Sequence, residues 1–208
     1  MAKTRKKNGD IFEVSLQPYL DAFAYVKYID ITKYNSDAKY PDILRVFDFI
    51  SDKQIESIQE IQTRDLMMNP IYISGGYGVV KLFRFVGWED IRSDELDFPH
   101  LRISIPDDAE DRNLPIVGWK VISPDYKVIN DSPLPYEAVK HLDTPGLIIN
   151  IDYLAYRISL EIFKRQSYNI LDYFELDWYQ HNILRRVNEM PNFSRLADSV
   201  LPVNLSEL

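Results

Sequence analysis

The block Asn8–Leu16 does most to limit what this chain can fold into. Within it, the apolar residues Phe12, Val14 and Leu16 alternate with residues that point to the opposite side. A period of two is typical of a half-buried β-strand, because successive side chains project to opposite faces of the strand. Residues 1–8 are basic and lack this pattern. We therefore expect a disordered basic tail that ends where the first strand begins.

Short runs of β-branched and aromatic residues, separated by turn-forming residues, continue through the first half of the chain. Such runs predict further strands. The nearly continuous apolar run Ile43–Ile50 predicts a central strand buried on both faces. The other predicted strands are Phe23–Ile31, Ile71–Ile73, Val79–Val86, Leu101–Ile105 and Ile116–Ile122, the last in a hairpin with Tyr126–Ile129.

Helical patterns dominate the second half. Leu154, Ile158 and Ile162 recur every four residues, which predicts one face of a helix. Asp177 stands where it would cap the last helix. In the first half, Ser51 with Gln54 three residues later has the pattern of a capping box, and we expect a helix there too.

No glycine- or serine-rich hinge separates the two halves. The sequence therefore favours one compact α+β unit over two free domains. We expect a β-rich part over residues 9–130 and a helical extension over residues 131–208 that packs on the same core. The apolar residues of Asn192–Leu208 predict that this tail docks on the rest of the protein.

The composition limits the class of function. The formal net charge is −8 and the isoelectric point is about 4.9. This balance argues against a nucleic-acid binder and suits either solubility or attraction to a basic partner. The chain has no cysteine, which excludes disulfides and thiolate chemistry and fits a cytoplasmic protein. No apolar run approaches the ~20 residues that would cross a membrane.

Two acidic stretches have three possible interpretations: a solvated loop, a docking patch for a basic protein, or paired carboxylates for catalysis or metal binding. Their spacing does not match a calcium loop, and a general acid would need burial to raise its pKa. The solvated loop is the simplest interpretation, and the docking patch comes next. The residues are Asp94, Glu95, Asp97, Asp107, Asp108, Glu110 and Asp111.

Neither the glycines nor the histidines form a recognised motif. The sequence Gly75-Gly76-Tyr77-Gly78 lacks the spacing of a phosphate-binding loop, so it predicts a hairpin turn. His100, His141 and His181 are about forty residues apart, and we expect no shared metal or catalytic site and no cofactor.

Aromatic residues offer a second candidate surface. Trp88 and Trp119 each follow a glycine, and the chain has fourteen tyrosines. Together they could line a groove for a sugar or a peptide. The alternative is an ordinary barrel or sandwich core with exposed tyrosine hydroxyls.

The opening block Lys7-Asn8-Gly9-Asp10-Ile11-Phe12-Glu13-Val14-Ser15-Leu16 resembles the start of the immunity protein 26 family, whose members begin with a K-x-G-D-x-F-x-[IV]-P-L strand. Phe23-Ala24-Tyr25-Val26 answers to the family's second strand, and Phe83–Trp88 and Phe98–Leu101 fit its later order. Ser15 stands where proline is common. The resemblance covers about residues 7–105.

This resemblance implies a strongly curled antiparallel sheet, SH3-like or barrel-like, in the first half. It also implies a non-enzymatic bacterial protein that neutralises a cognate toxin, often a nuclease. The family offers no catalytic residues. An acidic inhibitor of a basic toxin would use complementary charge for fast capture and aromatic anchors for residence time. We expect the two acidic stretches to form the electrostatic face, with Trp88 as an anchor.

Two other classes of function stay open. One is a carbohydrate- or peptide-binding module on the tyrosine-rich sheet. The other is a hydrolase whose dispersed carboxylates meet in a cleft about 5–10 Å apart. The sequence does not specify an oligomeric state.

Overall fold

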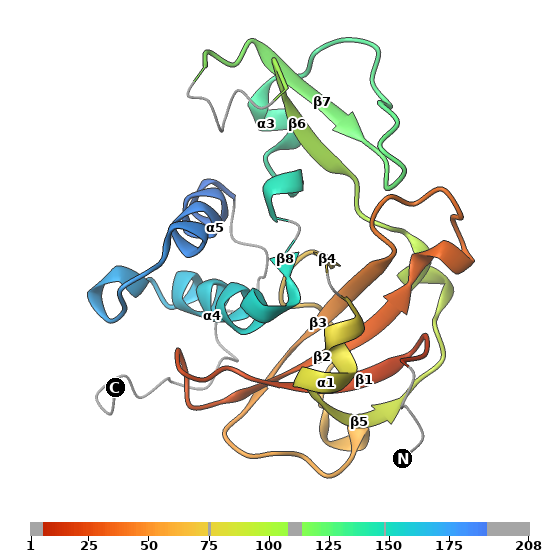
Figure 1. Ribbon diagram of the computed structural model, residues 1–208, viewed down its shortest axis with the longest axis vertical. Helices are drawn as coiled ribbons and strands as arrows, with labels where there is room; N and C mark the ends of the chain where they lie inside the picture. The colour runs from red at the N-terminus through yellow and green to blue at the C-terminus, as the bar shows by residue number, and fades with distance from the viewer. Residues whose placement is uncertain (1–5, 75, 108–113, 148, 191–208) are drawn as a thin grey trace.

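The computed structural model describes residues 6–74, 76–107, 114–147 and 149–190. It is an α+β protein with a six-stranded sheet, a separate two-stranded ribbon and helices mostly in the second half (Figure 1). The strands are β1 Asp10–Ser15, β2 Phe23–Asp30, β3 Asp42–Ser51, β4 Ile71–Ser74, β5 Arg84–Trp88, β6 Leu101–Ile105, β7 Gly118–Ile122 and β8 Ile149–Asn150. The α-helices are α1 Val79–Leu82, α3 Tyr136–Val139, α4 Leu154–Arg165 and α5 Trp178–Glu189.

The large sheet has the strand order β5-β1-β2-β3-β4-β8. Its pairs are antiparallel except at one edge, where β8 runs parallel to β4. The barrel-like closure expected from the resemblance is not confirmed, because β5 and β8 form two different edges and no ladder joins them in the described residues.

The glycine segment does not form the expected hairpin. Gly76–Gly78 is a 3₁₀ turn that leads into the single helical turn α1. The chain then crosses to the far edge of the sheet, where β5 pairs with β1 instead of with β4. This crossover makes β5 an edge strand next to the N-terminal strand.

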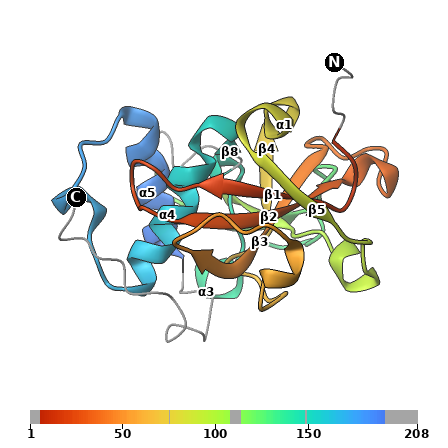
Figure 2. The ribbon, with the colours of Figure 1, turned by 90° about the horizontal axis from the view of Figure 1, so that it is seen from below.

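The main core lies between one face of the large sheet and the two long helices. Phe12, Val26 and Leu44 contribute to it from the sheet, and Ile158 and Ile183 contribute from α4 and α5. Figures 1 and 2 show these helices together at one side of the sheet. The predicted four-residue repeat in α4 is confirmed, because every residue of that repeat is buried.

Local capping explains where the last helix begins. The Asp177 side chain accepts a hydrogen bond from the Gln180 backbone N–H at 2.7 Å, and the Gln180 side chain accepts one from the Asp177 N–H. The predicted cap is therefore confirmed. The predicted docking of Asn192–Leu208 falls outside the described residues.

The helix predicted after Ser51 is wrong. That segment holds only a 3₁₀ turn at Ile58–Glu60, whose cap is Ser57. Ile55 and Ile61 are buried on the second face of the sheet, around Tyr25 and Phe47. Their spacing imitates a helix, but they pack from a mostly irregular segment. No helix in the described parts of the chain has the length and apolar character needed to cross a membrane.

Candidate functional site

The opening block fixes the position of Trp88. Gly9 adopts a left-handed backbone conformation with φ of +90°, and a Cβ atom there would lie 2.0 Å from the Glu89 carbonyl oxygen. The Glu89 N–H donates to the Gly9 carbonyl at 3.0 Å, and the Trp88 Nε1–H donates to the Asn8 carbonyl at 2.8 Å. Only glycine allows this close approach. The turn at residues 8–9 therefore holds the end of β5.

Lys27 holds the loop that follows β5. Its side chain is completely buried, and its Nζ donates to the Asp90 carbonyl and to Glu95 Oε2, both at 2.7 Å. The Glu89 carboxylate lies 3.8 Å from the same ammonium group. A single buried cation thus ties residues 89, 90 and 95 to β2.

The Glu95 carboxylate is the centre of this network. Besides Lys27, it accepts a hydrogen bond from the Arg92 backbone N–H at 2.9 Å, and Arg45 Nε lies 3.5 Å away. A buried carboxylate needs this many partners because its desolvation is expensive. Burial lowers the pKa of the neighbouring Arg45, an effect that the charge of Glu95 opposes.

The residues predicted to bind a partner lie in different environments. Trp88 and Asp97 are exposed, whereas Glu95 points inward and supports the loop. Asp94 is exposed and pairs with Arg92 at 3.1 Å, and these hydrogen bonds hold the pKa of Asp94 below its usual value. No local pattern in the sequence indicates that one of these three neighbouring acids faces inward.

The second acidic stretch is not next to the first. Asp107 is exposed and follows β6, whereas Asp97 precedes that strand. Five residues of strand span about 17 Å, so the two stretches stand at opposite ends of β6. Asp108, Glu110 and Asp111 lie outside the described residues.

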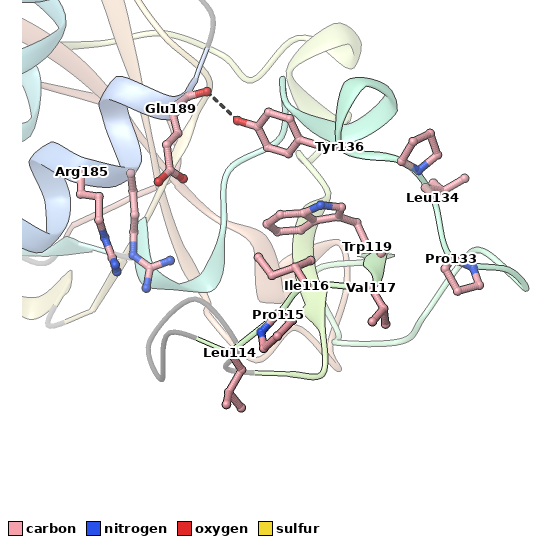
Figure 3. A pocket seen from close by; sticks show the side chains of 13 residues that line it. Leu114, Pro115, Ile116, Val117, Trp119, Pro133, Leu134, Tyr136, Arg185 and Glu189 are labelled. Carbon is pink, nitrogen blue, oxygen red and sulfur yellow. Dashed lines mark hydrogen bonds between the residues drawn. The ribbon is translucent and has the colours of Figure 1, made fainter.

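A groove lies between the segment before β7 and the end of α5, and of the two tryptophans predicted to line a groove it is lined by Trp119 but not by Trp88 (Figure 3). Its volume is about 1080 Å³, and Leu114, Ile116, Val117, Trp119, Tyr136 and Glu189 are among its lining residues. The Tyr136 hydroxyl donates to the Glu189 carbonyl at 2.6 Å and so links the two walls. Val117 is 74% exposed. The sequence predicted a strand over residues 116–122, in which Val117 would be paired. In the structure β7 begins only at Gly118, so Val117 lies before the strand and is exposed.

The floor of the groove is held by a buried cation. The Arg102 guanidinium lies 5.0 Å from the ring centres of both Trp119 and Tyr136. Its Nη1 donates to the Lys140 carbonyl at 2.9 Å. This cation–π arrangement fixes the two rings from below.

The described residues contain several buried carboxylates. No group of three or more histidine, aspartate or glutamate side chains there could hold a metal ion. Four of the six buried carboxylates in the described residues each pair with a cation, an arrangement that suits a structural role. These pairs are Glu13–Arg84, Asp48–Arg165, Glu95–Lys27 and Glu161–Arg157.

The fold is that of a mixed α+β protein. The turn at residues 8–9, the strand β5 and the loop after β5 all belong to its first half. The family model described as Immunity protein 26 matches residues 7–113, just over half of the chain. The chain therefore belongs to the Immunity protein 26 family. No curated protein and no solved structure shows significant similarity to it.

Proposed function

We propose that this protein is a non-enzymatic immunity protein that binds a cognate toxin in the cytoplasm and neutralises it. The observation that carries this proposal is the family match over residues 7–113. The net charge of −8 favours a basic toxin, such as a nuclease, because opposite charges speed the encounter of two proteins.

The proposed contact surface is Trp88 with the acidic residues that follow it. Trp88 supplies an aromatic side chain of the kind that anchors protein interfaces. Asp94 and Asp97 supply exposed negative charge, while Glu95 acts from below by holding their loop on Lys27. The proposal extends to the second stretch, which comprises Asp107, Asp108, Glu110 and Asp111.

Co-expression tests the function. A candidate cognate toxin is expressed in a bacterial host, with and without this protein. Growth should be restored only when both are present, and the two purified proteins should form a stoichiometric complex. Restored growth without a complex would contradict direct neutralisation.

Charge variants test the surface. Asp94→Asn, Asp97→Asn and Asp107→Asn combined should slow association and flatten its salt dependence. The matched control neutralises three exposed acids elsewhere, namely Asp131→Asn, Asp172→Asn and Glu175→Gln. Equal association rates for the two triple variants would show that the acidic stretches do not form the electrostatic face.

The groove of Figure 3 favours one second candidate, a module that binds an apolar peptide. Its rigid aromatic floor and exposed Val117 are suited to such a ligand. A thermal-shift screen of apolar and proline-rich peptides tests it, with sugars as the comparison. Stabilisation that Val117→Asp abolishes would support this candidate, and the absence of any stabilisation would count against it.

A further inference from the structure

The groove of Figure 3 exposes apolar side chains along one wall. Leu114 is 44% exposed, Ile116 is 40% exposed and Val117 is 74% exposed, and all three line the groove. Trp119 forms part of the floor, where the buried Arg102 holds its ring in place. Contiguous apolar surface in a preformed hollow indicates a place where another apolar segment packs.

The opposite wall of the groove is the point at which α5 ends. Glu189 is the last residue of that helix and lines the groove, and its carbonyl accepts the hydrogen bond from the Tyr136 hydroxyl at 2.6 Å. Met190 follows it and is the last residue that the structure describes. The chain therefore leaves α5 at the edge of the groove, so the segment that follows begins beside an exposed apolar surface.

Residues 191–208 lie outside the described residues, and their sequence has the composition of a segment that packs. Seven of these eighteen residues are large and apolar, among them Phe193, Leu196 and Val200, and only three are charged. Segments that stay solvated are poor in large apolar residues, because they cannot bury enough apolar surface to offset the loss of chain entropy. This composition favours a bound segment over a solvated one.

We infer that residues 191–208 of this chain occupy the groove, with their apolar side chains against Leu114, Ile116 and Val117. Residues 191–196 span up to about 20 Å when extended, so the connection is long enough for Leu196 to enter. The groove, at about 1080 Å³, is larger than the hollow of about 220 Å³ that Asn188 lines on α5. Because groove and segment belong to one chain, their effective concentration is high, and a separate peptide would have to displace the segment.

Crosslinking between two introduced cysteines tests this inference in the full chain, which has no cysteine of its own. The test pair is Val117→Cys with Ser199→Cys, and a short bis-maleimide should join the two within one molecule. The matched control pair is Asn188→Cys with Ser199→Cys, because Asn188 is exposed, lies closer to Ser199 in the sequence and lines the smaller hollow instead. The test pair should react about threefold faster or more, since docking raises the local concentration of Ser199→Cys at the groove.

Charged residues in the segment separate docking from mere proximity. Leu196→Asp with Val200→Asp keeps the length of the connection and should reduce the rate of the test pair to that of the control pair, because burying a carboxylate in an apolar groove is costly. Equal rates for the two pairs, or a test rate that the two aspartates leave unchanged, would overturn the inference. Crosslinked dimers would also overturn it, since the groove would then hold the segment of a second copy. Circular dichroism verifies folding, and if Val117→Cys is unfolded, Leu114→Cys replaces it on the same wall.

Discussion

Replacing Lys27 with methionine should lower the free energy of unfolding by about 3 kcal/mol. The reason is that Glu95 would keep its buried position and lose its closest cation, at 2.7 Å. Removing one partner of a buried ion pair typically costs about 3–5 kcal/mol. We expect a cost at the lower end of this range, because the Arg92 N–H at 2.9 Å and the Arg45 Nε at 3.5 Å stay beside the Glu95 carboxylate.

The double variant Lys27→Met with Glu95→Leu isolates the charge interaction. An apolar pair avoids the desolvation of both groups, so its cost should be no more than about 1 kcal/mol. The double variant should therefore be about 2 kcal/mol more stable than Lys27→Met alone. Lys33→Met, at an exposed lysine of the first half, is the control and should be nearly neutral.

Urea unfolding at neutral pH measures these differences. With a slope of about 2–3 kcal/mol per molar urea, the midpoint of Lys27→Met should fall by roughly 1 M with an unchanged slope. A midpoint within about 0.3 M of wild type would refute the argument that this ion pair holds the loop. A double variant as unstable as the single one would refute the assignment to charge.

Three further predictions concern local geometry. Gly9→Ala should lower the free energy of unfolding by more than about 2 kcal/mol in a urea titration, because it combines a left-handed residue with a backbone clash. Asp177→Ala should lower it by about 1 kcal/mol through loss of the helix cap, again by urea titration. Asp125 should titrate by carboxyl NMR with a pKa of about 2, mainly because Lys127 donates to it, and Lys127→Ala should move that pKa up toward 3.8. A pKa depressed in the folded state means that Asp125 stabilises the protein above pH 3.8, and this contribution disappears as the pH falls toward 2.

Local patterns predicted the elements that are stabilised locally. The strand after Gly9, the four-residue repeat of α4 and the cap at Asp177 each depend on neighbours within one element, and all three are present in the structure. The expectation that this strand is half-buried was wrong, because Ile11 and Glu13 on its second face are buried as well. The Ser51 pattern failed because tertiary burial of Ile55 and Ile61 overrode it. Spacing alone does not distinguish a helical face from an irregular segment that lies on a sheet.

The sequence identified residues of the candidate surface, but it did not indicate which of them face the solvent and which support the loop from inside. Trp88 and the neighbouring acids stand out in the sequence by type. The inward turn of Glu95 depends on Lys27, which is 68 residues earlier in the chain. A register shift in the β1–β5 ladder also places Phe85 and Trp88 on the same face of the sheet, and this shift depends on the pairing with β1. Pairings between distant segments leave no mark in a local pattern.

The short strand β8 affects how the sheet is covered while the chain is being synthesised. β4 is not covered until residues 149–150 arrive, and the apolar face of the sheet waits longer for α4 and α5. A nascent chain that has reached residue 113 therefore carries the whole family segment with an open sheet edge and an uncovered apolar surface. Such surfaces promote aggregation. The second half of this protein therefore covers the sheet edge and the apolar face that the first half would otherwise leave exposed.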